Sequence, residues 1–397
     1  MSRTTRIALF LSLAGVYSAS AQAPTIRGYY LNVGLWSDST PLNAGGFGDV
    51  SRFRVMTEPT IGPVGLEVAY EHVLTYSARA SGGTSGGIVV PGGGEWVELQ
   101  WALEESDHVA WRHRFDRLNA SWAPKEWVAL TAGRQTISWA TTLLLGPADP
   151  FIPFDPSDPF RDYRAGVDAL RLQAFPSPLS DVDLVLRLAK VRRGGTVADE
   201  TVTVLGRGRG VWRNWELSGW FGVLHDRAAG AIGAAGGAGQ LALRGELSVR
   251  DGDGGVDVRG AVGVDSRLDL MGRDFYWSVE YQHDDLGAAS ADELARVASS
   301  PAFARGELQT LSRDVVATQL SYQPHPLWTT DLLMLWSLTD GSALLLPGAT
   351  YSASNEITLR AGLFMGVGDG TATGATPIPS TYGVTPTIVY LSASLFF

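Results

Sequence analysis

Apolar and polar residues alternate along much of this chain, with large apolar side chains at every second position. The pattern is clearest at residues 241–250, 256–265, 275–282 and 357–365, where the intervening positions carry charged, hydroxyl or small side chains. A period of two predicts β-strands with one apolar face. That face recurs from strand to strand without helices to cover it. We therefore expect it to face lipid, as in an outer-membrane barrel.

Short connections alternate with long ones between the predicted strands. The short ones fall at residues 59–63, 124–126, 176–181, 213–214, 270–273, 323–327 and 355–356. The long ones fall at residues 37–49, 78–107, 141–165, 287–313 and 369–382. Outer-membrane barrels have short periplasmic turns and longer extracellular loops, so this alternation predicts an up-and-down antiparallel topology.

The number of strands depends on how residues 229–237 are interpreted. This segment contains Ala, Gly and a single Ile, which is the composition of a linker. Without it the count is about seventeen, whereas such barrels have an even number of strands. Interpreted as a strand of small residues, it raises the count to about 18, with 16 as the alternative. We predict an all-β fold, a transmembrane antiparallel up-and-down β-barrel formed by residues 24–397, with no second domain.

The N-terminal residues have the pattern of a secretory signal peptide. Arg3 and Arg6 precede a mostly apolar run at residues 7–16, and two overlapping Ala-x-Ala sites follow at residues 19–23. The apolar run is too short to cross a bilayer as a helix. We expect residues 1–23 to be cleaved during secretion, and a soluble N-terminal helix is the alternative.

The charge and the cysteine content exclude several classes of protein. The chain has a formal net charge of −10 and no cysteine. An acidic chain lacks the basic surface that nucleic-acid binding requires. Without cysteine it can form neither disulfides nor thiolate metal sites. We therefore expect no nucleic-acid partner, and closure of the barrel must supply the stability.

The last strand has a regular apolar face. Within residues 387–397 this face consists of Val389, Leu391, Ala393, Leu395 and the terminal Phe397. The segment resembles the terminal strand by which the insertion machinery recognises outer-membrane barrels. That resemblance implies the barrel-insertion machinery, outer-membrane lipid and lipopolysaccharide as partners.

Three motifs resemble those of an outer-membrane porin-like family. They are Gly133-Arg134-Gln135-Thr136-Ile137-Ser138-Trp139, a Pro/Asp/Phe loop over residues 146–161, and Gly166-Val167-Asp168-Ala169-Leu170-Arg171. Residues 340–347 are similar to the Asp-Gly-Ser hairpin of that family. Ala140 stands where the family pattern has glycine. The resemblance implies a pore or an exporter barrel and does not imply a substrate.

The Pro/Asp/Phe loop at residues 141–165 is the candidate functional segment. Its five prolines prevent it from extending a sheet, and Phe151, Phe154 and Phe160 need burial. We predict that it folds into the lumen as a constriction, with acidic residues facing arginines of the wall, which would select solutes by charge. The predicted constriction residues are Arg134, Asp149, Asp155, Asp158, Arg161, Asp162, Arg164, Arg171 and Arg187. In the alternative, the acids form turns and the arginines merely solvate the lumen.

Other candidate sites are weaker. A hydrolytic site could use His225-Asp226 or His283-Asp284-Asp285, but neighbours in a strand point to opposite faces, so these groups would have to pair across strands. The glycines at 206–210 precede no helix that could bind phosphate. Residues 251–255 fit a hairpin turn better than a calcium loop. Residues 95–101 suggest an extracellular hairpin rather than a sugar-binding aromatic strip. We expect no enzyme activity, cofactor or metal.

These features together favour an outer-membrane pore for passive diffusion or export of small solutes. The alternative is a non-conducting barrel that serves as an assembly or adhesion anchor, and an outer-membrane hydrolase is less favoured. The sequence does not identify the solute or the direction of transport.

Overall fold

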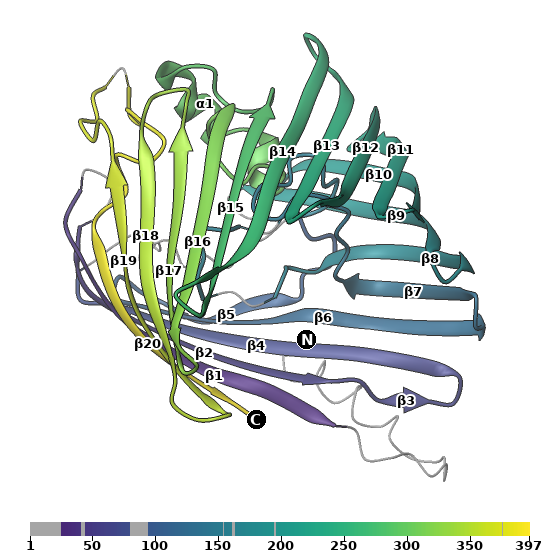
Figure 1. Ribbon diagram of the computed structural model, residues 1–397, viewed down its shortest axis with the longest axis horizontal. Helices are drawn as coiled ribbons and strands as arrows, with labels where there is room; N and C mark the ends of the chain where they lie inside the picture. Colours follow the sequence, from purple (N-terminus) through teal and green to yellow (C-terminus); the bar gives the residue numbers. More distant parts are fainter. Residues whose placement is uncertain are drawn as a thin grey trace.

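The computed structural model describes residues 25–40, 44–79, 94–153, 155–160, 163–193, 196–374 and 376–397. The predicted signal peptide at residues 1–23 lies outside the described residues. The described chain forms a closed antiparallel β-barrel of eighteen strands, as predicted from the alternation (Figure 1). The strands of the ring are β1 (Ile26–Ser37), β2 (Gly46–Thr57), β4 (Val64–Ser77), β6 (Val109–Lys125), β7 (Val128–Gln135), β8 (Val167–Ser177), β9 (Ser180–Arg193), β10 (Thr196–Trp212), β11 (Trp215–Leu224), β12 (Arg227–Ala238), β13 (Leu241–Gly252), β14 (Gly255–Leu270), β15 (Arg273–Asp284), β16 (Asp314–His325), β17 (Trp328–Ser337), β18 (Ala343–Ser352), β19 (Ile357–Val367) and β20 (Ile388–Phe396).

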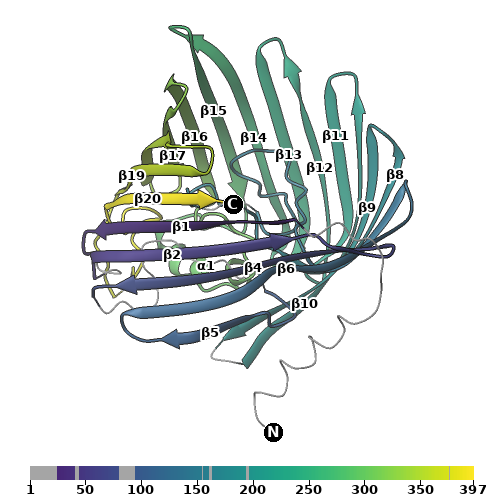
Figure 2. The ribbon, with the colours of Figure 1, turned by 90° about the horizontal axis from the view of Figure 1, so that it is seen from below.

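The first and last strands close the ring. β1 pairs with β2 on one side and with β20 on the other, and Figure 2 shows β1 and β20 side by side. The seam extends to the last residue, because the N–H of Gly28 donates to the carbonyl of Phe397 at 2.8 Å and the N–H of Phe397 donates back at 3.0 Å. The ring of Phe397 stacks on Phe53 at 5.9 Å. Closure leaves the main ring without a free edge.

The segment of small residues is a strand of this ring. β12 covers the predicted residues 229–237 and pairs along its length with β11 and β13. Its small side chains leave room inside the barrel. A methyl group added to Gly233, for example, would lie 2.2 Å from Oγ1 of Thr141 in a loop that crosses the interior. The interpretation of this segment as a strand is confirmed.

Two further strands lie outside the regular up-and-down order. β3 (Thr60–Ile61) is a two-residue extension that pairs with the start of β4. β5 (Gln100–Glu105) pairs with the N-terminal part of β6. Glu95 forms a bridge to Ala189 of β9. β7 and β8 are shorter than their neighbours β6 and β9. The 94–105 segment therefore completes the wall beyond the short β7–β8 hairpin.

The helical segments belong to the connection between β15 and β16. They are η2 (Ala291–Glu293), α1 (Leu294–Ala298) and α2 (Pro301–Ala304), and Figure 1 shows α1 at one end of the barrel. We call residues 285–313 the cap loop. None of the helices in the described part of the chain is long or apolar enough to cross a membrane.

Candidate pore interior and its pocket

The connection from β7 to β8 runs through the interior of the barrel. We call residues 136–166 the inner loop. The backbone N–H groups of Leu143, Leu144 and Leu145 donate to the carboxylate of Glu280 on β15, at 2.7, 2.8 and 2.8 Å. β15 lies almost opposite β7 in the ring. The loop therefore crosses the lumen and is bound to the far wall.

A second carboxylate holds the same limb of the inner loop. Glu246 on β13 accepts hydrogen bonds from the N–H groups of Thr141, Thr142 and Ala148, at 2.6, 3.3 and 3.1 Å. A proline-rich loop cannot satisfy its N–H groups in a sheet, and carboxylate acceptors form stronger bonds with them than neutral groups do. Sequence reasoning missed both glutamates, because each looks like any polar residue on the lumen face of a strand.

The returning limb packs against the wall on the other side. Phe160 lies edge-on to Tyr390 of β20, with ring centroids 4.8 Å apart, and its carbonyl accepts from Arg52 of β2 at 2.8 Å. The carbonyl of Pro159 accepts from Arg360 of β19. Phe151 is buried against Trp139 at 5.0 Å. The two anchor phenylalanines within the described residues are thus buried, and Phe154 lies outside them.

The acidic residues of the inner loop make local contacts. Asp149 accepts from the hydroxyl of Ser138 at 2.8 Å and pairs with Arg164 at 3.2 Å. Asp155 accepts from the N–H and hydroxyl of Ser157 at 2.8 and 2.7 Å, and Asp158 accepts from the N–H of Phe160 at 2.9 Å. The contacts of Asp155 and Asp158 with nearby N–H groups form turns. Asp149 instead joins the two limbs of the loop, and Asp158 also interacts electrostatically with Arg52 of the wall. Arg161 and Asp162 lie outside the described residues.

The three predicted wall arginines interact with acidic side chains outside the inner loop. Arg134 pairs with Asp168 at 2.8 Å and donates to the carbonyl of Val97 at 2.7 Å, which ties the 94–105 segment to the wall. Arg171 pairs with Asp183 at 2.8 Å. Arg187 is buried and interacts electrostatically with Glu307, Asp168 and Glu95. Asp168 was part of the sequence motif, but neither it nor Asp183 was among the predicted site residues.

A buried network of charges lines the wall beside the returning limb. Arg54 of β2 pairs with Asp116 of β6 at 2.7 Å and with Glu71 of β4 at 3.2 Å. Arg114 pairs with Glu71 at 3.0 Å, and Arg117 pairs with Asp116 at 2.6 Å. The guanidinium of Arg54 also lies over the ring of Tyr163, 4.6 Å from its centroid. Because these arginines are paired with wall acids, they do not stand free in the lumen, and Arg54 also contacts the inner loop through Tyr163.

The cap loop is held by a second buried cluster of charges. Glu307 accepts from Arg250 of β13 and pairs with Arg305, both at 2.7 Å, and its carbonyl accepts from Arg259 of β14 at 2.8 Å. Burial alone would raise the pKa of Glu307, but the surrounding positive groups hold it well below its usual range. Burial lowers the pKa of His225, in the β11–β12 turn, to about 3, so this imidazole is neutral at pH 7.

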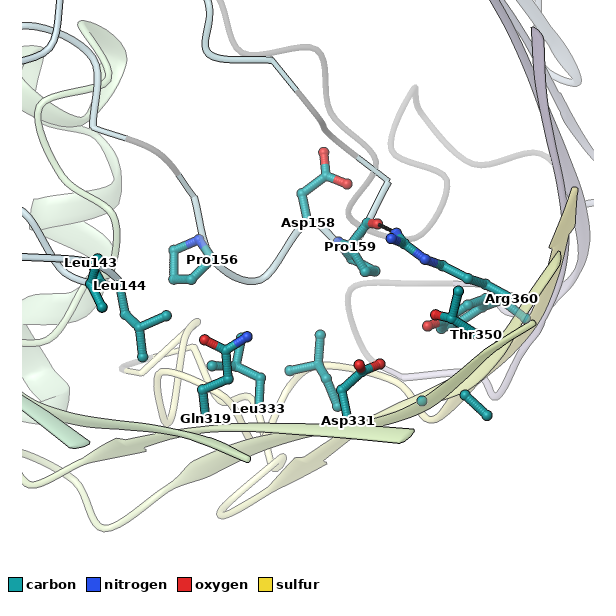
Figure 3. Close-up of a pocket in the computed structure, with 14 residues that line it drawn as sticks. Leu143, Leu144, Pro156, Asp158, Pro159, Gln319, Asp331, Leu333, Thr350 and Arg360 are labelled. Carbon is teal, nitrogen blue, oxygen red and sulfur yellow. Dashed lines mark hydrogen bonds between the residues drawn. The ribbon is translucent and has the colours of Figure 1, made fainter. Parts of the chain in front are cut away.

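A cavity of about 360 Å³, lined by both polar and apolar side chains, lies between the inner loop and the wall formed by β16 to β20 (Figure 3). Arg360 and Asp331 stand on the wall side, as Figure 3 shows, and Leu333 and Leu346 provide apolar surface. Arg360 is fixed by its bond to Pro159, whereas Asp331 has no ion-pair partner among the described residues. The cavity is further lined by Leu143, Leu144, Pro156, Asp158, Pro159, Gln319, Gly348, Ala349, Thr350 and Tyr390. It therefore offers both charge signs to a small polar solute.

The histidine–aspartate candidates lie elsewhere. His225 bonds to the hydroxyl of Thr201 at 2.8 Å and faces Glu307. His283 pairs across strands with Asp314 at 2.8 Å, on the same face of β15 as the exposed Tyr281 and outside the pocket. In the described ranges, no group of three or more His, Asp or Glu side chains could hold a metal ion.

The barrel is similar to solved outer-membrane porins. It matches OccAB1 of Acinetobacter baumannii with a TM-score of 0.58 and 9% identity, over 96% of this chain and 99% of that chain. For the BenF-like porin of Pseudomonas fluorescens Pf-5 the values are 0.56, 12%, 95% and 99%. For Pseudomonas aeruginosa OpdK, solved with vanillate, they are 0.53, 11%, 94% and 98%. No protein-family model matches the chain, and no curated protein matches its sequence. At identities this low, the structural similarity establishes that the fold is shared and says nothing more about this chain.

Proposed function

We propose that this chain is an outer-membrane pore through which small solutes diffuse passively. The observation that carries the proposal is the cavity between the inner loop and the wall, with Arg360 and Asp331 among its lining residues, inside a barrel of the porin type. A barrel of eighteen strands is wide enough to enclose more than its own side chains. The signal peptide at residues 1–23, the outer-membrane location and insertion through the strand that ends in Phe397 belong to the same proposal.

The inner loop is the constriction in this account. Glu246 and Glu280 fix one limb to the far wall, and Arg52 and Arg360 fix the other. Solutes then pass through the space that remains between the loop and β16 to β20. Of the predicted constriction residues, Asp158 lines that space.

The cavity also suggests which solutes pass. Arg360 uses one N–H group on Pro159 and keeps others for a carboxylate, which a guanidinium binds well. The structural neighbour OpdK was solved with vanillate, a carboxylate. Asp331 offers a partner for a donor or a cationic group on the same solute. We propose small organic carboxylates that also carry a hydrogen-bond donor.

One observation favours the alternative of a closed barrel that serves as an anchor. Glu307 of the cap loop and Arg259 of β14 are buried where the loop meets the wall, as expected of a loop that seals one end of the barrel. A swelling assay separates the two functions. Liposomes that contain the refolded mature chain are diluted into iso-osmotic 4-hydroxybenzoate, arabinose or a large dextran. The pore predicts swelling in the first two and none in dextran, whereas absence of swelling in all three would support the anchor.

A further inference from the structure

A row of four register partners crosses the wall of the cavity. Asp331 of β17 is the partner of Gly348 on β18. Gly348 in turn is the partner of Gly362 on β19, and Gly362 is the partner of Tyr390 on β20. The two central positions carry no side chain, so the polar residues at the two ends of the row can extend over them.

The ring of Tyr390 covers one of the two glycines. A methyl group added to Gly362 would lie 2.6 Å from Cζ of Tyr390, so the ring lies directly over that position. Phe160 of the inner loop and Phe364 of β19 pack against the same ring, with centroids 4.8 and 5.7 Å from it. Only 7% of Tyr390 is exposed. Its ring is therefore fixed, and its hydroxyl group is carried across β19 towards Gly348.

The hydroxyl of Tyr390 and the carboxylate of Asp331 meet over the second glycine. A methyl group added to Gly348 would lie 3.4 Å from the hydroxyl oxygen and 3.3 Å from Oδ2 of Asp331. Both residues line the cavity, and within the described part of the chain neither side chain forms a hydrogen bond or an ion pair. The groups that satisfy them must come from the cavity. We call the space over Gly348, between these two polar groups, the Gly348 notch.

We propose that the Gly348 notch binds a hydroxyl group of the solute, and that Asp331 and Tyr390 are the residues that determine this specificity. A hydroxyl group donates one hydrogen bond and accepts others, so it can donate to Asp331 and accept from Tyr390 at the same time. A solute that places an apolar group in the notch leaves both protein groups unpaired. Sites built to bind a hydroxyl discriminate against such analogues for this reason.

The position of Arg360 indicates where the carboxylate of the same solute lies. Arg360 is the register partner of Thr350, which is two residues from Gly348 on β18, a separation of roughly 7 Å along the strand. Figure 3 shows Arg360 and Asp331 on the cavity side of the wall. A solute that reaches both Arg360 and the notch carries its carboxylate and its hydroxyl at opposite ends, as 4-hydroxybenzoate does. The inference rests on the proposed function, because it concerns solutes of the same cavity.

Equilibrium binding to the refolded barrel in detergent micelles tests the notch without relying on conduction. Ligand-observed NMR titrations compare 4-hydroxybenzoate, benzoate and 2-hydroxybenzoate, in which the hydroxyl lies beside the carboxylate, and empty micelles correct for partitioning. We expect 4-hydroxybenzoate to bind about threefold to tenfold more tightly than the other two, which is the effect of one or two hydrogen bonds. Equal affinities for the three solutes would overturn the proposal.

Two variants assign the preference to the notch. Tyr390→Phe keeps the packed ring and removes only the hydroxyl, and Gly348→Ala fills the space between the two polar groups. We expect both to lose most of the preference for 4-hydroxybenzoate while the affinity for benzoate stays unchanged. Tyr276→Phe is the matched control, on the same face of β15 as Glu280 and outside the pocket.

A preference that survives in both notch variants would show that another site reads the hydroxyl. Heat-modifiable mobility in gels establishes that each variant is folded. Swelling in arabinose reports separately on the pore. Swelling without a preference for 4-hydroxybenzoate would contradict the notch alone, whereas a preference without swelling would contradict the pore alone.

Discussion

The carboxylate of Glu280 accepts a hydrogen bond from the backbone N–H of Leu144 at 2.8 Å, across the width of the barrel. Through this contact and its neighbours, a loop that leaves the wall at β7 is bound to the wall almost opposite. The loop is therefore part of the interior rather than a mobile extracellular segment.

Removal of this acceptor should free the loop. Glu280→Ala leaves three backbone N–H groups without a partner, which costs about 2–3 kcal/mol or more of unfolding free energy in lipid. We expect noisier and larger single-channel currents as well. Ser278→Ala, on the same face of β15, is the control and should change neither quantity. Wild-type stability in Glu280→Ala would show that these hydrogen bonds do not hold the loop.

The two faces of β13 should respond oppositely to changes of charge. Leu247 is 45% exposed on the outward face, and Leu247→Arg should cost roughly 2–4 kcal/mol of folding free energy near the bilayer midplane. Arg244, on the inner face, forms a partly exposed pair with Asp265 at 3.1 Å, and Arg244→Leu should cost less than about 1 kcal/mol. Urea titration in lipid vesicles measures both. Similar costs at the two positions would mean that the faces are assigned wrongly.

The two charges of the pocket should act in opposite directions on ion selectivity. Arg360→Gln removes the pocket's guanidinium and should raise the ratio of cation to anion permeability, whereas Asp331→Asn should lower it, each by about twofold at low salt. Reversal potentials in a salt gradient measure the ratio. Arg267→Gln, an exposed arginine paired with Asp274 outside the pocket, is the control. Shifts of equal sign for the two pocket variants would exclude the pocket from the conduction path.

Acid should loosen the cap loop. The pKa of His225 is about 3 in the folded state against an ordinary 6.5, because burial disfavours its charged form. The unfolded chain therefore binds more protons between these values, and stability is lost as the pH falls through 6.5 towards 3. The lowered pKa of Glu307 acts in the same direction below its ordinary value of 4.5. Both groups thus favour the closed cap at neutral pH.

Hydrogen exchange of peptides from residues 285–313 tests this pH dependence. After correction for the intrinsic rate, we expect protection to be lower at pH 4.5 than at pH 7. His225→Gln removes the titration of the imidazole and should reduce the difference between the two pH values. Protection that is independent of pH in the wild-type chain would contradict the assignment.

The alternation of side chains was enough to predict the barrel, because the residues of each strand show by themselves which face contacts lipid and which faces the interior. β12 was predicted instead from the even number of strands that such barrels have, and its small residues pair with β11 and β13. The prolines and phenylalanines of the inner loop likewise predicted burial, and Phe151 and Phe160 are buried.

The contacts that hold the loop could not be predicted in this way. Glu246 and Glu280 lie between 98 and 137 residues from the N–H groups they bind, and nothing in their local sequence distinguishes them from other lumen-facing acids. The partners of Arg134 depend on the 94–105 segment, whose place in the wall follows from the unequal lengths of β6, β7, β8 and β9. These contacts join residues that are far apart in the sequence, and only the closed barrel brings them together.

Single-channel recording in planar bilayers tests the central claim most directly, if the mature chain is compared with a variant that lacks residues 147–160. We expect stepwise conductance from the wild-type barrel. The deletion should give a larger conductance and a weaker charge preference, because the segment that narrows the lumen is gone. Silence of the wild-type chain at every voltage, or identical conductance and selectivity in the two proteins, would contradict a pore constricted by the inner loop.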